Sequence, residues 1–237
     1  MANYLAITNE LLRRLNEVTV SQDDFPNVRN IQALAKDAVN ASIRGILQSA
    51  QEWPFTLTTY TETLVVGTQE YSFQADMSSV DWESFYLKRL TSANNYPTQL
   101  DVLSYAEYLD RFRAEDDVGG TGAYAAPIRV YQTQEAKYGL SPIPDETYEL
   151  EYKYWAFPAD LSAYDDTPVI PDRFRHVIID GAMAYMMRFR SNEQSAMIHQ
   201  NNYSDGIGMM RRLLLDDPID VRSTYILPNF YQRVVSR

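Results

Sequence analysis

The chain has 237 residues, of which 45% are hydrophobic and 22% charged, and it contains no cysteine. A chain of this length can bury a full hydrophobic core without stabilisation by covalent cross-links. The lack of thiols excludes disulfides, thiolate metal sites and a cysteine nucleophile. The formal net charge of −11 argues against a general nucleic-acid clamp, because displacing counterions from phosphates requires a basic surface.

The N-terminal residues show no basic region followed by an apolar block, and nowhere do eighteen apolar residues run together. This pattern predicts a soluble protein with no secretion signal and no membrane segment. The absence of cysteine fits a reducing cytosol or a particle assembled in one.

Residues 1–52 are predicted to form the first half of a helical part, with two helices. The apolar stripe of the first helix carries Tyr4, Ile7, Leu11, Leu15 and Val18. The stripe of the second helix, after Pro26, carries Ile31, Leu34, Ala38 and Ala41. The second helix also contains Gly45 and further alanines, small residues that let helices pack closely.

Residues 53–160 are predicted to form an inserted antiparallel β part, because the hydrophobic period changes to two after Trp53. A hairpin is expected from segments 56–66 and 69–74, with Gly67 leading its turn. Further strands are expected at 84–89, 99–103, 128–133, 137–143 and 148–156, with a short helix at 105–114. In the last strand, one side of the sheet receives Tyr148, Leu150, Tyr152 and Tyr154.

Residues 161–217 are predicted to supply the second half of the helical part. A helix opens at Pro171, because the first turn of a helix tolerates proline, and its stripe carries Phe174, Val177, Ile178, Gly181 and Tyr185. Gly181 leaves room for a close neighbour, which we expect to be the next helix. The stripe of that helix carries Ala196, Gln200, Tyr203, Ile207, Met210 and Leu214, and Pro218 ends it.

Residues 218–237 are predicted to form an extended C-terminal arm, rich in apolar side chains and holding three arginines against one aspartate. Such a segment is too apolar to stay in water, so we expect it to bury itself on a partner. The alternative is that it folds back onto its own domain as a terminal strand. The predicted fold class is α+β: a helical bundle from N- and C-terminal helices, with an inserted antiparallel β domain and this arm.

No sequence pattern indicates catalysis, a cofactor or a metal site. The loop at Gly119–Gly122 lacks the Gly-Lys-Ser/Thr ending of a phosphate loop, and no strand-to-helix context is expected around it. His176 and His199 lack zinc-binding spacing and are expected at the surface or at helix caps. We therefore predict that the protein is not an enzyme. A hydrolase that acts through a pair of carboxylates is an alternative, since the distance between two carboxylates cannot be read from a sequence.

The order of the parts and the stretch PVIPDRFRHVIIDGA at 168–182 resemble the head-to-tail connector, or adaptor, proteins of tailed bacteriophages, particularly of the short-tailed type. The matching features are the early helix pair, YGLSPIP at 138–144 leading into YELEYKY at 148–154, the helix opened at Pro171 and the C-terminal tail. The resemblance implies a virion structural protein of the neck, assembled in the host cytoplasm. It would form a ring, usually a dodecamer, which joins the portal protein to the tail tube or nozzle protein and leaves a channel for DNA. An acidic lumen would let DNA slide without sticking.

Within this resemblance, the arm would bind the portal. Its apolar contacts with the portal would come from Tyr225, Ile226, Leu227, Phe230 and Tyr231. Its polar contacts would come from Arg222, Arg233 and Arg237. A second hypothesis is a carbohydrate-binding β module of a phage or bacterial surface protein. There, sugars would stack on exposed tyrosines of the strand at 148–154 and on Trp82 and Trp155.

Overall fold

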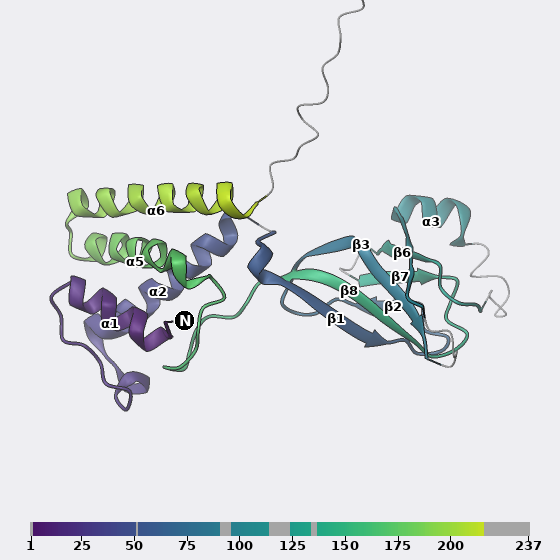
Figure 1. Cartoon of the computed structure of the whole chain (residues 1–237), viewed down its shortest axis with the longest axis horizontal. Helices are drawn as coiled ribbons and strands as arrows, with labels where there is room; N and C mark the ends of the chain where they lie inside the picture. The colour runs from purple at the N-terminus through teal and green to yellow at the C-terminus, as the bar shows by residue number, and fades with distance from the viewer. Residues whose placement is uncertain (1, 51, 91–95, 114–123, 134–136, 216–237) are drawn as a thin grey trace, which may run out of the picture.

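The computed structural model describes residues 2–50, 52–90, 96–113, 124–133 and 137–215. The chain forms a helical part, a β part and connections between them near Trp53 and after Ala156 (Figure 1). Each part has its own hydrophobic core. The predicted α+β class is confirmed.

The helical part consists of α1 (Tyr4–Arg14), α2 (Asn30–Ser49), α5 (Arg175–Phe189) and α6 (Glu193–Leu214), with the short 3₁₀ turns η1 (Phe25–Asn27) and η3 (Asp172–Phe174). Side chains cap two of these helices: Asn3 accepts a hydrogen bond from the N–H of Ala6, and Asn192 from that of Ser195. The α5 helix packs against α1, α2 and α6 and is buried on several sides.

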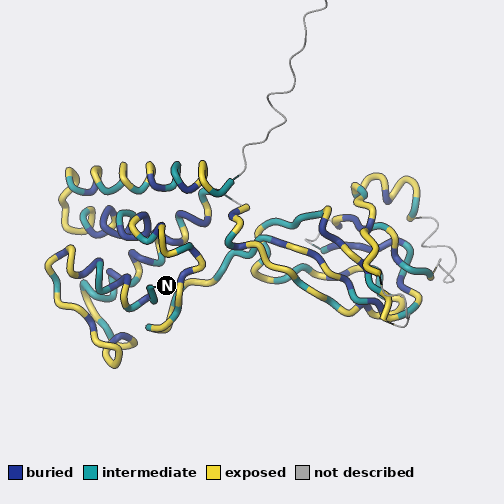
Figure 2. The backbone as a smooth tube through the Cα atoms, viewed as in Figure 1, coloured by how far each residue is buried: buried dark blue, intermediate teal, exposed yellow. Residues whose placement is uncertain are grey.

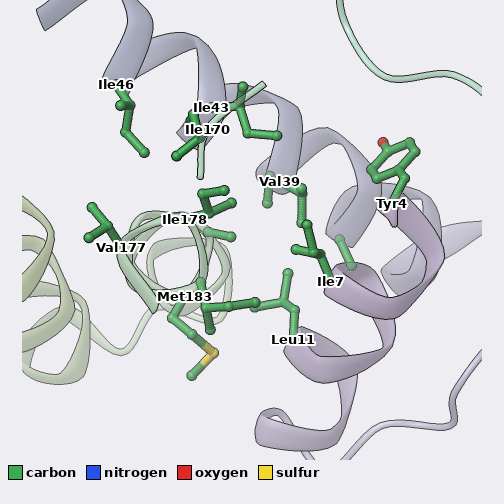
Figure 3. Close-up of a cluster of buried hydrophobic side chains, with 14 of the residues drawn as sticks. Tyr4, Ile7, Leu11, Val39, Ile43, Ile46, Ile170, Val177, Ile178 and Met183 are labelled. Carbon is green, nitrogen blue, oxygen red and sulfur yellow. The ribbon is translucent and has the colours of Figure 1, made fainter. Parts of the chain in front are cut away.

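The core of the helical part gathers side chains from α1, α2 and α5 (Figure 3). The stripe predicted for α1 is buried except for Val18, which follows the end of the helix and is 77% exposed. The stripe predicted for α2 is displaced, because Val39, Ile43 and Ile46 face the core whereas Ala41 is exposed. The cause is tertiary: α2 packs against both α1 and α5, so its buried face is wider than one predicted row.

The β part holds two four-stranded sheets packed as a sandwich. One sheet has the order β1 (Leu57–Thr63), β8 (Tyr148–Ala156), β3 (Met77–Arg89) and β4 (Thr98–Gln99). The other has the order β2 (Glu70–Ser72), β7 (Lys137–Ser141), β6 (Arg129–Gln132) and β5 (Asp101–Leu103). All their pairs are antiparallel except β5 with β6. The turn η2 (Pro54–Thr56) precedes β1, and α3 (Tyr105–Arg111) follows β5.

The predicted hairpin between β1 and β2 is wrong, because these strands belong to different sheets. The chain crosses the sandwich between them, with Leu64 and Tyr71 both buried in the shared core. The Tyr71 hydroxyl group accepts a hydrogen bond from the N–H of Val65 at 2.9 Å and donates one to its carbonyl oxygen at 3.2 Å. The single strand predicted at 99–103 is likewise divided at the buried Leu100 into β4 and β5.

The alternation predicted for β8 is confirmed, and its tyrosines are buried in the core between the sheets. Figure 2 shows how buried and exposed positions are distributed over the strands of the β part. The ring of Tyr152 stacks on Phe85 with centroids 4.8 Å apart, and the ring of Tyr138 on β7 stacks on Tyr71 at 5.6 Å. The core of the β part is therefore largely aromatic.

Candidate interaction surfaces

The eight arm residues predicted to bind a partner lie at positions 222–237, outside the described residues. The structure instead shows how the helix before the arm is held. Because α6 leads directly to that segment, its packing decides where the segment begins.

The middle of α6 is locked where three helices meet. The hydroxyl group of Tyr203 donates a hydrogen bond to the carbonyl oxygen of Ser42 on α2 at 2.8 Å, and burial raises the pKa of Tyr203. The Ser42 hydroxyl group donates to the carbonyl oxygen of Ile178 on α5 at 2.9 Å. A Cβ atom at Gly181 would lie 2.3 Å from the Ser42 oxygen, and one at Gly45 would lie 2.5 Å from the Tyr203 oxygen. The prediction that Gly181 accommodates the next helix is confirmed.

Further contacts hold α6 on both sides of this point. The Nδ1 atom of His199 lies 3.0 Å from an Asp180 carboxylate oxygen on α5. Closer to the end of α6, the Arg211 side chain donates to the carbonyl oxygen of Ser49 on α2. The helix is thus fixed along much of its length, so the following segment leaves from a defined place.

That place borders a hollow of about 760 Å³ between the helical part and the β part. Leu214 and Leu215 line it together with Leu57 and Trp155 of the sandwich. This hollow could not be predicted from the sequence, because its walls come from three stretches of the chain, at 48–57, 155 and 214–215, that only the fold brings together.

Among the exposed large apolar side chains of the described residues, two groups lie far apart along the chain fold. Near the turn between α5 and α6, the exposed residues are Tyr185, Phe189, Met197 and Ile198, at 46–64% of their surface. At the end of β1 away from the helical part (Figure 1), the exposed residues are Val65 and Val66, with the exposed Tyr124 ring close to Gly67. Tyr185 was predicted to face the core. It instead lines a shallow hollow floored by small residues of α2 and by Gly181.

The sequence matches the family of SU10 adaptor proteins over residues 2–225. The chain belongs to this family. The match covers the helical part and the β part and ends at Tyr225, inside the arm. The resemblance to phage head-to-tail adaptors is confirmed at this level. No curated protein matches the chain.

The tyrosines of β8, on which the carbohydrate hypothesis partly depended, are not exposed. Tyr148, Tyr152 and Tyr154 of β8 are buried between the sheets. Trp82 is half-buried, with its ring stacked on Phe85 at 5.5 Å, and Trp155 is half-buried at the junction hollow. The alternating tyrosines of β8 therefore belong to the hydrophobic core of the β part.

Two carboxyl groups of the adaptor have a lowered pKa with a local structural cause. Asp166 accepts hydrogen bonds from the N–H groups of Ser162 and Ala163, which lower its pKa. Hydrogen bonds from Ser104, the N-cap residue of α3, lower the pKa of Glu107. His176 is exposed, as predicted. Over the described ranges, no cluster of three or more histidine or acidic side chains is placed to hold a metal. None of the helices there has the length and apolar character to cross a bilayer.

Proposed function

We propose that this adaptor is a structural protein of the phage neck that forms a ring between the portal protein and the tail tube or nozzle protein. The observation that carries the proposal is the family match across nearly the whole chain. The two separate exposed apolar groups add support, because a closed ring requires two different surfaces on each subunit. We propose a dodecamer, as the resemblance implies.

Each part has its own role in this proposal. The helical part, residues 1–52 and 161–217, forms the ring, and the β part, residues 53–160, meets neighbouring subunits or the tail protein. The arm, residues 218–237, binds the portal through Arg222, Tyr225, Ile226, Leu227, Phe230, Tyr231, Arg233 and Arg237. The contacts that hold α6 on α2 support this assignment. Because the helix before the arm has the same orientation in every subunit, the arms of a ring would all start in the same direction.

The channel is proposed to pass DNA without sequence-specific binding. The net charge of −11 supports this role, because an acidic lumen repels phosphates and prevents sticking. We propose no catalytic activity, cofactor, metal or membrane association. The site of action would be the virion neck, after assembly in the host cytoplasm.

The test is to measure the mass of the purified protein, alone and with its cognate portal, by light scattering and negative-stain electron microscopy. The full chain should cap the portal with a ring, and a chain ending at Pro218 should not. Within the full chain, Phe230→Ala with Tyr231→Ala should weaken capping, whereas Asn229→Ala serves as the matched control. Capping by the shortened chain would refute the arm assignment, and indifference of both chains to the portal would refute the adaptor ring.

A further inference from the structure

The β1 strand forms an edge of its sheet, and one side of its backbone is open. Across the described ranges, β8 is the only strand paired with β1. The N–H of Leu64 bonds to the carbonyl oxygen of Tyr148 at 2.8 Å, which fixes the direction of the groups before it. Because successive residues of a strand point their backbone groups to opposite sides, those of Thr59, Thr61 and Thr63 face away from β8.

This edge lacks three of the usual protections against strand addition. Proteins blunt exposed edges with lysine, proline, a bulge or an inward-pointing charge, and of these β1 has only the last, in Glu62. The sequence of β1, LTTYTET, contains no lysine or proline, and its register with β8 runs from Leu57 to Thr63 without a shift. By contrast, the pairing of β3 with β8 is interrupted twice. An open and regular edge of this kind is a template for an extended segment.

The sandwich is also incompletely closed along β1. Tyr60 and Glu62 point to the inner face, since Tyr60 contacts the ring of Tyr152 at 5.5 Å and Glu62 accepts a hydrogen bond from Tyr138. Both residues of β1 remain half-buried, whereas Tyr152 and Tyr138 are fully buried. A further strand beside β1 would cover the exposed parts of these two side chains.

The chain itself supplies a matching segment at the right place. Leu215, the last described residue, lines the same hollow as Leu57, the first residue of β1. After Asp216-Asp217-Pro218 come nine residues, IDVRSTYIL at 219–227, bounded by a second proline at 228. Within this stretch, one alternating set contains Ile219, Val221, Tyr225 and Leu227. Nine extended residues span about 30 Å and the seven of β1 about 23 Å, so the segment is long enough to cover the edge.

We propose that, in the free subunit, residues 219–227 add to the open edge of β1 as a fifth strand of that sheet. Since β1 runs away from the helical part (Figure 1) and the described chain ends with Leu215 at the hollow beside the start of β1, the two strands would be parallel. The set containing Val221 and Tyr225 would cover Tyr60. Under the proposed function, the portal would have to take this segment from β1. The strand addition itself goes beyond the proposed function and does not depend on it.

The test is amide hydrogen exchange of the purified protein without portal, resolved to single amides by NMR. Four chains are compared: the full chain, a chain ending at Asp217, Ser223→Pro within the segment, and Ser236→Pro as the matched control beyond it. We expect the amides of Thr59, Thr61 and Thr63 to exchange at least about tenfold more slowly in the full chain and in Ser236→Pro than in the other two, because strand pairing protects them and proline disrupts it. Tyr60 and Glu62, whose N–H groups face β8, should stay protected in all four and report that the fold is intact.

Equal exchange of the three threonine amides in all four chains would overturn the proposal. Protection that survives removal of residues 218–237 and increases with protein concentration would also overturn it, and would assign the edge to a second copy.

Discussion

The hydroxyl group of Tyr203 on α6 donates a hydrogen bond to the main-chain carbonyl oxygen of Ser42 on α2 at 2.8 Å. The Tyr203 ring reaches this position only because Gly181 of α5 has no side chain, since a Cβ atom there would lie 2.7 Å from the ring. This contact joins three helices that come from the two ends of the chain. Several measurable properties of the adaptor depend on this contact and on the aromatic core of the β part.

Gly181→Ala should destabilise the helical part, because the added methyl group would overlap Ser42 and Tyr203. Overpacking of this kind costs about 1–3 kcal/mol. Gly208→Ala on α6 is the matched control, since a Cβ atom there has no atom within 4 Å, and replacing a helical glycine should stabilise the fold by about 0.5–1 kcal/mol. Urea unfolding followed by circular dichroism measures both. Equal effects of the two substitutions would contradict the close packing at Gly181.

Two tyrosines of the sandwich should respond differently to loss of the hydroxyl group. The Tyr138 hydroxyl donates to a Glu62 carboxylate oxygen at 2.5 Å, so Tyr138→Phe removes a bond to a charged group and should cost about 1.5–3 kcal/mol. The Tyr152 hydroxyl is buried and has no hydrogen-bond partner among the described residues. Tyr152→Phe should therefore leave the free energy of unfolding unchanged or raise it. A larger loss from Tyr152→Phe than from Tyr138→Phe in urea unfolding would refute this assignment.

The adaptor should lose stability in alkali. Burial raises the pKa of Tyr138, Tyr152 and Tyr4 above the ordinary value of 10, so the unfolded chain releases these protons more easily than the folded one. Their contribution is fully present below pH 10 and falls as the pH rises through the folded values. Absorbance at 295 nm and circular dichroism, recorded together, should show these tyrosines ionising only as the fold is lost. Complete ionisation of all tyrosines at pH 10 with the fold intact would contradict their burial.

Asp166 should stabilise the loop that joins the β part to α5. Its carboxylate accepts from the N–H groups of Ser162 and Ala163, each at 2.7 Å, and its own carbonyl oxygen accepts from the N–H of Tyr4 on α1. Asp166→Ala should lower the melting temperature at neutral pH, whereas Asp165→Ala, the exposed neighbour, should change it less.

The effect of Asp166 should depend on pH with a definite sign. Because its pKa is lowered from 3.8 on folding, its contribution is present above that value and disappears as the pH falls through the folded pKa. The difference in melting temperature between the native chain and Asp166→Ala should therefore shrink in acid. A difference that stays constant down to the lowest pH at which both chains fold would contradict the role of the charge.

Local patterns in the sequence predicted several elements well. The strand at 148–156 was predicted with its observed bounds. Strict alternation of apolar and charged side chains in a strand determines which face is buried. The start of the third long helix was placed within a few residues by Pro171, which fixes a backbone angle locally. The close approach at Gly181 was also predicted, although its partner Ser42 was not.

Errors arose where a residue's neighbours come from distant segments. The segments around Gly67 have the composition of a hairpin, but pairing with β8 and β7 places them in separate sheets. Ala41 and Tyr185 lie on helical rows that fit a core, yet both are exposed, because the neighbouring helices contact other rows of α2 and α5. The partner-binding residues of the arm lie outside the described ranges and remain a prediction.

The sequence by itself determined the α+β class, the order of the parts, the inner face of β8 and the family, because these depend on local periodicity and on residue identity. Only the tertiary structure decided which strands pair, which rows of α2 and α5 are buried, and that β1 has an open edge beside the end of α6. The reason is physical: the free energy of pairing and burial is a property of two surfaces in contact, and a linear pattern specifies only one of them.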